Sequence, residues 1–165
     1  MDSFPERLHA TRHTAFHLEM RDSYTPTDPT FLAWKRGELF DEVEYYRAWT
    51  ELVRAATARG VAVRRARIVS EPVTDYIRFE HSLTRLNLEA GEDVRWLPRR
   101  QASDIALPGN DFWILDGRLV RFAHFSGDGD SLGPEWTEDS AVARLCAEAF
   151  EAVWERAIPH EDYKI

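Results

Sequence analysis

The sequence predicts a single mixed α+β domain, in which helices cover a mixed β-sheet. The chain has 165 residues, which is enough for one domain with a core of its own. Segments with helical periodicity alternate with segments in which apolar residues alternate, and the order ends in a three-strand meander and a closing helix. No repeat, low-complexity tract or linker divides the chain. We therefore expect one α+β domain over 15–165, preceded by a flexible N-terminal arm at 1–14.

The first part of the domain is expected to begin with a short strand. Apolar and polar residues alternate over 16–20, which indicates a strand, and the proline-rich segment 23–29 indicates a loop. A short helix is expected at 30–37. The first long helix is predicted at 42–59, because apolar residues recur there at three- and four-residue spacing and Gly60 can cap its end.

A strand followed by a helix is predicted next. Residues 61–69 are rich in β-branched side chains and should form the strand. Ser70 is the expected N-cap of the following helix, whose first turn would contain Glu71. Residues 73–88 carry the helical pattern. A strand at 76–80 is the alternative, because Tyr-Ile-Arg-Phe-Glu also alternates.

The segment 110–125 predicts a β-hairpin that turns at Asp116-Gly117. Both residues can adopt a positive φ, and an apolar run lies on each side of them. We expect this hairpin to be central in the sheet, with the long helices at 42–59 and 139–157 covering it. The other elements expected in this part are a short strand at 94–97, a loop at 98–109 and a strand at 132–137.

The composition argues against several classes of function. The net charge is −8, with 21 basic and 29 acidic residues. Proteins that bind nucleic acid without a partner need a basic face, so we expect no direct nucleic-acid binding. The start of the chain shows no secretory signal, and no apolar run is long enough to span a membrane. We therefore expect a cytoplasmic protein that does not bind a membrane.

Neither a metal nor a cofactor is predicted. Cys146 is the only cysteine, which excludes an internal disulfide and a cysteine-built zinc site. Its apolar, helical neighbours favour a buried thiol. The histidines show no metal-binding spacing, and the Asp128-Gly-Asp130 turn lacks the further ligands of a calcium loop. No phosphate-binding or dinucleotide-binding glycine motif occurs.

Charged residues concentrate between the end of the predicted strand at 61–69 and the start of the helix that follows it. In α/β sheets, ligands bind beyond the carboxyl ends of strands. Arg67 together with Ser70 could hold a carboxylate or phosphate there, although acidic residues in the first turn oppose anion binding. The alternative is that these charges form a salt-bridge network that braces the helix against the sheet.

Two residues of the hairpin complete the predicted site. Asp111 and Trp113 share one face of the first hairpin strand, whereas Asp116 has the opposite parity and is interpreted as a turn residue. If a cleft exists, we expect it between the end of the 61–69 strand and the hairpin. The predicted lining is Arg67, Glu71, Asp75, Arg78, Asp111 and Trp113.

The hairpin resembles the strand pair that carries the His-x-Lys-x4-Asp motif in phospholipase D-like enzymes. With Asp116 in the Asp position, Gly109 and Asp111 stand where the catalytic His and Lys belong. Because the nucleophile and the phosphate-binding Lys are both replaced, we expect a phospholipase D-like half-domain with no catalytic residues. The alternative is a hydrolase with a remodelled cleft.

Several motifs are similar to those of the actinobacterial domain-of-unknown-function family numbered 6879, and together they cover nearly the whole chain from about residue 14. They are Trp49-x-x-Leu52 with the following residues to Gly60, the segment 69–80, Ala90-Gly-Glu-Asp93, Asp111-Phe-Trp-x-Leu-Asp116 and the segment 154–163. Members resemble the phospholipase D-like effector half of some transcription regulators and tend to be encoded beside helix-turn-helix regulators.

The resemblance implies an accessory regulatory protein that binds a helix-turn-helix regulator, a small effector, or both. A homodimer is also compatible with it. No established activity of the family supplies catalytic residues.

Overall fold

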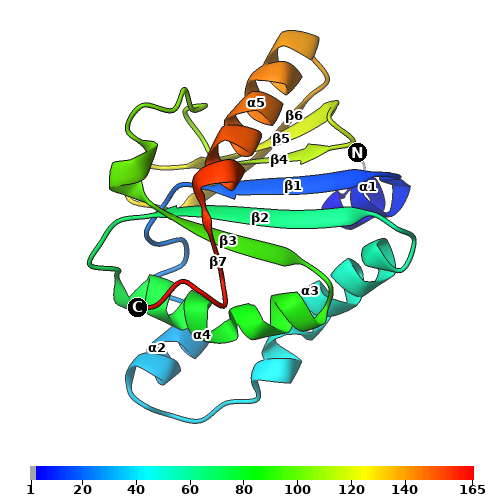
Figure 1. The fold of residues 1–165 in the computed structure, drawn as a ribbon. Helices are drawn as coiled ribbons and strands as arrows, with labels where there is room; N and C mark the ends of the chain where they lie inside the picture. The colour runs from blue at the N-terminus through cyan, green and yellow to red at the C-terminus, as the bar shows by residue number, and fades with distance from the viewer. Residues whose placement is uncertain (1–2) are drawn as a thin grey trace.

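The structure is a computed structural model that describes residues 3–165. Seven strands form one mixed sheet in the order β6-β5-β4-β1-β2-β3-β7 (Figure 1). β1 pairs parallel with β2, and β2 pairs parallel with β3, whereas the other neighbours are antiparallel. The strands are β1 (Thr14–Glu19), β2 (Ala62–Val69), β3 (Asp93–Pro98), β4 (Phe112–Leu115), β5 (Leu119–Phe125), β6 (Ser131–Thr137) and β7 (Ile158–Pro159). The mixed α+β fold predicted from the sequence is confirmed.

Within residues 3–165, five α-helices accompany the sheet. They are α1 (Phe4–Ala10), α2 (Pro29–Lys35), α3 (Glu42–Thr57), α4 (Asp75–Glu89) and α5 (Ser140–Arg156), and a short 3-10 helix, η1, spans Arg99–Ala102. The longer helices begin where a side chain caps the first turn. The side chains of Asp41, Thr74 and Asp139 accept backbone N–H groups of α3, α4 and α5.

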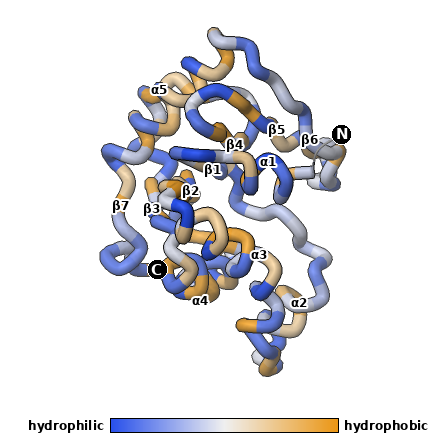
Figure 2. The backbone as a smooth tube through the Cα atoms, turned by 90° about the vertical axis from the view of Figure 1, so that its right-hand side faces the viewer, coloured by the Kyte–Doolittle hydropathy of each residue, from blue (hydrophilic) through white to orange (hydrophobic). Residues whose placement is uncertain are grey.

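The helices cover both faces of the sheet. α5 lies on one face, where Cys146 and Phe150 pack with Leu18, Ala66 and other even-numbered strand residues. α1, α3 and α4 lie on the opposite face (Figures 1 and 2). The odd-numbered residues of β1, β2, β4 and β5 and the even-numbered residues of β3 and β6 point to this face. The two long helices predicted to cover the sheet therefore do so, but from opposite sides. The even–odd division follows from the alternation of side chains along a strand.

The prediction that the hairpin is central in the sheet is wrong, because β1 occupies the central position. β1, β2 and β3 are joined by crossovers through α3 and α4 and extend the sheet to one side. The hairpin of β4 and β5 is added on the other side of β1 through β4. Pairing between distant segments decides this order, and local sequence patterns do not show it.

The predicted N-cap at Ser70 is also wrong. The helix begins four residues later than this cap implies, with Thr74 as its N-cap, and the peptide bond between Glu71 and Pro72 is cis. Ser70 instead donates its backbone N–H and its hydroxyl to the carboxylate of Asp22 at 2.8 and 2.7 Å. Residues 76–80 are helical, so the alternative strand is excluded.

The segment predicted as a flexible arm is packed where the structure describes it, and residues 1–2 lie outside the described residues. Ser3 and Glu6 form a capping box at the start of α1. Leu8 is fully buried, and Phe4 packs on the ring of Trp113. The correction has a simple physical reason. Phe4 and Leu8 are four residues apart, so in a helix both lie on the side that faces the core, although the segment is mostly polar.

Cys146 is free and buried, as expected. Residues 3–165 contain no group of three or more His, Cys, Asp or Glu side chains placed to hold a metal ion. No helix among these residues is both long and apolar enough to cross a membrane.

Candidate ligand-binding site

Five side chains form a line across five neighbouring strands, on the face that α1 and α3 cover. In order from β2 to β6, these are Arg65, His17, Trp113, Arg121 and Trp136. Each is paired in register with the next, so their side chains emerge on the same face about 5 Å apart. We call this set the cross-strand row. It contains two guanidinium groups, one imidazole and two indole rings.

The members of the cross-strand row contact one another through their ring faces. The imidazole of His17 stacks on Trp113, with ring centroids 4.3 Å apart and an angle of 16° between the planes. The Cζ atom of Arg65 lies 5.7 Å from the centroid of Trp113. The Cζ atom of Arg121 lies 5.9 Å from that of Trp136 and 5.5 Å from that of Phe4. These separations are typical of cation–π contacts.

A hollow of about 570 Å³ lies over the row, and we call it the aromatic pocket. The row contributes His17, Arg65, Trp113 and Arg121, and the helices contribute Phe4, Tyr45, Tyr46, Ala48 and Trp49. Small-molecule sites have this size and combine aromatic walls with few polar groups. The lining includes two guanidinium groups and no carboxylate.

The helix α3 supplies the aromatic wall because its side chains repeat at helical spacing. Tyr45 and Trp49 are four residues apart and therefore lie on one side of the helix. The ring of Trp49 lies 5.6 Å from that of Trp113 on the sheet. Its Nε1 donates to Glu92 at 2.9 Å, which fixes the orientation of the indole.

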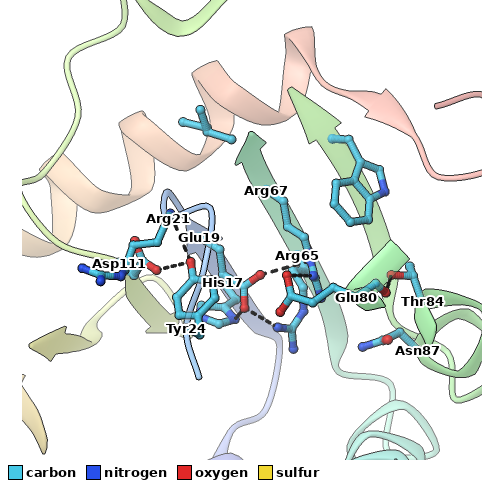
Figure 3. Close-up of polar contacts among 12 residues, drawn as sticks. His17, Glu19, Arg21, Tyr24, Arg65, Arg67, Glu80, Thr84, Asn87 and Asp111 are labelled. Carbon is cyan, nitrogen blue, oxygen red and sulfur yellow. Dashed lines mark hydrogen bonds and ion pairs between the residues drawn. The ribbon is translucent and has the colours of Figure 1, made fainter. Parts of the chain in front are cut away.

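Beside the aromatic pocket lies a buried ionic cluster, formed by Glu19, Arg65, Arg67, Glu80 and Glu92. Figure 3 shows the first four of these residues. Arg65 donates from Nη1 to Glu19 at 2.6 Å and from Nε to Glu92 at 2.7 Å. Arg67 pairs with Glu19 at 3.1 Å and with Glu80 at 2.5 Å. Arg65 belongs to both sites, so the cluster fixes one guanidinium of the pocket.

The buried ionic cluster contains three carboxyl groups and only two guanidinium groups. The two Arg67 pairs are close, but their atoms are not aligned as hydrogen bonds. Burial raises the pKa of Glu80 to about 7, against the opposing effect of Arg67 and with a further contribution from the charge of Glu19. Glu80 is therefore the carboxyl group of the cluster that takes up a proton near neutral pH.

Asp111 and Tyr24 form a second buried pair at the carboxyl end of β1 (Figure 3). The hydroxyl of Tyr24 and the backbone N–H of Met20 both donate to the carboxylate of Asp111, the latter at 2.9 Å. Burial raises the pKa of Asp111 to about 6, although both hydrogen bonds act in the opposite direction. Burial also raises the pKa of Tyr24, so its hydroxyl remains a donor.

Three of the six residues predicted to line a ligand site are buried on one face of the sheet, and three are exposed. Arg67 belongs to the buried ionic cluster, Asp111 pairs with Tyr24, and Trp113 lines the aromatic pocket. The exposed residues Glu71, Asp75 and Arg78 lie outside this pocket. Glu71 accepts the hydroxyl of Tyr163 at 2.8 Å, and Asp75 pairs with Lys35 at 3.1 Å. The structure does not bring the six residues into one cleft.

A smaller hollow, of about 340 Å³, lies where β2 and β3 end. Its lining includes Ser70, Glu71 and Arg99. Arg99 donates to the hydroxyl of Ser70 at 3.0 Å and to the carbonyl oxygen of Met20 at 2.5 Å, and it pairs with Asp22 at 3.4 Å. Its guanidinium thus joins three parts of the chain and is already engaged by protein groups.

The pocket residues that the sequence analysis missed come from elements far apart in the chain. His17, Arg65 and Arg121 each lie on a different strand, and only the register of the sheet aligns them. The parity of each strand was visible in the sequence. The residues Tyr45 and Trp49 on one predicted helix face were a further signal of an aromatic surface.

The fold and the pocket define a mixed α+β domain with a ligand-sized aromatic hollow on one face of its sheet. Residues 2–165 match the family described as "Domain of unknown function (DUF6879)", and the chain belongs to this family. No curated protein shows a significant match to the sequence.

The fold is similar to that of a solved structure described as TrmBL2, an archaeal chromatin protein that shows a novel mode of DNA binding. The TM-score is 0.50 at 15% sequence identity, and the match covers 93% of this chain and 47% of that chain. This chain therefore spans about half of that one. At this identity the likeness concerns the fold alone. The expected likeness to phospholipase D-like half-domains stays a prediction.

Proposed function

We propose that the chain is a non-catalytic sensor domain of a cytoplasmic regulatory system, and that it binds a small effector in the aromatic pocket. One observation carries this proposal. A hollow of about 570 Å³ is lined by aromatic rings and two guanidinium groups, with no carboxylate in its lining. Such a lining provides stacking surfaces and charge recognition, which are the requirements of binding.

The position of the acidic groups favours binding over catalysis. Glu80 and Asp111 have raised pKa values, which is common at active sites, but neither lines the aromatic pocket. Both are engaged with protein partners, Arg67 and Tyr24. A general acid or base must reach its substrate, so these carboxyl groups are poorly placed to act on a molecule in the pocket.

His17 is the observation that supports the alternative, a hydrolase with a remodelled cleft. It lines the pocket, and burial together with the charges of Arg65 and Arg67 holds its pKa well below the usual value. A neutral imidazole can act as a base. Its Nδ1 lies 3.5 Å from Glu19, but the ring is stacked flat on Trp113, which favours a structural role.

A blocking substitution tests the sensor proposal. Ala48 is exposed and lines the pocket, so Ala48→Trp should fill the hollow without removing any polar contact. Ala55→Trp, at an exposed position of the same helix outside the pocket lining, is the matched control. In a thermal-shift screen of small metabolites, we expect compounds that stabilise the unmodified chain and the control but not Ala48→Trp.

Two results would contradict the sensor proposal. One is a screen in which the same compounds also stabilise Ala48→Trp, or in which no compound stabilises any of the three proteins. The other is turnover of bis(4-nitrophenyl) phosphate or another generic ester that His17→Gln abolishes, because this result would establish the hydrolase alternative.

A helix-turn-helix regulator is the protein partner that we propose for this sensor. Exposed apolar side chains support a docking surface on α2, on α3 and in the segment that joins them: Leu39 in this segment is fully exposed, and Leu32 on α2 and Val43 on α3 are 38% and 57% exposed. The acidic net charge supports contact with a regulator, rather than with DNA directly.

Co-purification with a helix-turn-helix regulator encoded beside this chain tests the proposed partner. We expect Leu39→Ser combined with Val43→Ser to reduce the recovery of the regulator, while Leu132→Ser on β6, also at an exposed position, leaves it unchanged. Failure of the unmodified chain to retain the regulator at low salt would contradict the proposal. A homodimer detected by light scattering that the double substitution dissociates would assign the surface to a second copy instead.

A further inference from the structure

We propose that the aromatic pocket binds a flat aromatic or heteroaromatic molecule with one anionic group, held by Arg121 while the ring packs against Trp113. This inference rests on the proposed sensor function and adds the chemical class of the effector. It follows from three properties of the pocket: an unpaired guanidinium, a ring at the adjacent position, and a lining without negative charge.

Arg121 is the charged group of the pocket that no carboxylate of the described residues neutralises. Within residues 3–165, no acidic side chain lies within ion-pairing distance of it, and its buried Nε has no hydrogen-bond partner. Arg65 in the same lining is paired with both Glu19 and Glu92. A buried polar group of a folded protein is normally satisfied, so Arg121 is suited to an acceptor from outside the chain.

Aromatic rings surround the guanidinium and strengthen its attraction for an anion. Phe4 and Trp136 lie within 6 Å of its Cζ atom. Rings exclude water, and charge interactions become stronger as the local dielectric constant falls. Burial lowers the pKa of Arg121, as expected for a charge without a counter-ion, yet an arginine at this site remains protonated.

The position of Trp113 determines the shape of the ligand. Trp113 faces Arg121 across the β4–β5 pair. Facing side chains on neighbouring strands lie about 5 Å apart, so a ring that packs against Trp113 would place an attached anionic group beside Arg121. Trp49 and Phe4, with centroids 5.6 and 4.9 Å from that of Trp113, line the same space. A flat ring matches the apolar wall that these three rings form.

The charge of the lining selects the sign of the ligand. The chain carries a net charge of −8, but the pocket lining has no carboxylate. Arg65 is paired with Glu19 and Glu92, so Arg121 is the positive charge of the lining that no carboxylate of residues 3–165 compensates. The local potential therefore attracts a small anion, although the whole molecule repels a polyanion. Carboxylate and phosphate monoester both match the fork of an arginine, so the experiment must distinguish them.

Four probes and isothermal titration calorimetry test the class of ligand. Naphthalene-2-carboxylate carries both features, naphthalene-2-carboxamide lacks the charge, cyclohexanecarboxylate lacks the aromatic ring, and 2-naphthyl phosphate exchanges the anionic group. We expect naphthalene-2-carboxylate to bind at least about tenfold more tightly than the amide or the cyclohexane acid. The amide loses the charge-assisted interaction, and the cyclohexane acid loses the aromatic contact. The tighter of the two naphthyl anions identifies the anionic group.

Arg121→Gln provides the site-specific test, and Arg118→Gln is its control. Arg118 lies on the same hairpin, its side chain is 77% exposed, and it is absent from the lining of the pocket. We expect Arg121→Gln to remove the preference for the carboxylate over the amide, and Arg118→Gln to preserve it. Circular dichroism and a thermal melt confirm that both variants fold, which is expected because Arg121 has no ion pair to lose.

Separate results contradict this inference and the sensor proposal. Equal affinities for the carboxylate and the amide, a preference that survives Arg121→Gln, or no binding of any of the four probes would overturn the class of ligand. If Ala48→Trp nevertheless abolishes the stabilisation found in the metabolite screen, the sensor proposal stands. If Ala48→Trp leaves that stabilisation unchanged, both proposals fail.

Discussion

The carboxylate of Asp116 accepts the backbone N–H of His13 at 2.7 Å, although the two residues are 103 positions apart in the chain. The same carboxylate accepts the N–H groups of Arg12 and Thr14 at 2.9 and 3.0 Å. These bonds hold the start of β1 against the turn of the β4–β5 hairpin. The aspartate at the position of the expected phospholipase D-like motif is thus engaged with the backbone.

Replacement of Asp116 should destabilise the domain. Hydrogen bonds to a charged acceptor each contribute about 1.5–3 kcal/mol, so we expect Asp116→Asn to lower the free energy of unfolding by about 1–2 kcal/mol because part of the acceptor set remains. Asp116→Ala should cost more, since Asp116 has a φ of 51° that alanine tolerates poorly. Urea denaturation near neutral pH measures both changes. Asp128→Asn, in an exposed turn, is the control.

The effect of Asp116 should depend on pH. The three backbone N–H groups lower the pKa of its carboxyl group below the usual 3.8, so the folded state favours the ionised form. Its stabilisation is therefore present above this value and is lost as the pH falls through the folded-state pKa. The difference in unfolding free energy between the unmodified chain and Asp116→Asn should shrink on acidification; a difference that grows would contradict the assignment.

Arg67→Met should strongly destabilise the protein, because it leaves Glu19 and Glu80 buried without their common partner. Removal of one member of a buried ion pair typically costs about 3–5 kcal/mol. Adding Glu80→Leu should recover part of this loss, since one unpaired carboxyl group is then absent. A double-mutant cycle by urea denaturation measures the coupling, and strictly additive losses would show that the pair is not coupled.

Glu80→Gln should change the pH dependence of stability. Burial raises the pKa of Glu80 to about 7, so the folded state holds a proton that the unfolded state has released. The corresponding stabilisation is present below the unfolded-state pKa and is lost as the pH rises through about 7. Between about pH 5 and pH 8, the unmodified chain should therefore lose stability relative to Glu80→Gln. The exposed control Glu51→Gln should give a pH profile of stability parallel to that of the unmodified chain. A parallel profile for Glu80→Gln would contradict the raised pKa of Glu80.

Cys146 should react slowly with thiol reagents in the native protein. Its side chain lies on the buried side of α5, and burial raises its pKa to about 11, which leaves very little thiolate at neutral pH. We expect its reaction with Ellman's reagent to be at least about 100-fold slower than that of free cysteine and to accelerate on unfolding in urea. Rapid stoichiometric reaction of the folded chain would show that the thiol is accessible.

Much of the fold could be predicted because its elements have local signals. Short segments of sequence contain the signals for the periodicity of α3, the turn of the β4–β5 hairpin and the cap of α5. The central position of β1 and the packing of α1 depend on contacts between distant segments. The misplaced cap at Ser70 has the same origin, because its partner Asp22 lies 48 positions away.

Less of the candidate site could be predicted. Strand parity is local, and it placed Trp113 on the face of the sheet where the aromatic pocket lies. Its neighbours Arg121 and His17 lie beside it only because of the register of β1, β4 and β5. A sequence pattern specifies which face a side chain occupies, but the pairing of strands decides what lies next to it.

The binding of an aromatic anion in the pocket can be tested most directly through the indole Nε1–H signals in a nitrogen-15 NMR titration with naphthalene-2-carboxylate. The chain has six tryptophans, and single Trp→Phe variants assign their signals. Trp49 and Trp113 line the pocket, whereas Trp154 lies on the opposite face of the sheet. We predict that the signals of Trp49 and Trp113 shift and saturate while that of Trp154 stays fixed. Saturating shifts at Trp154 alone, or unchanged signals of Trp49 and Trp113, would contradict this account.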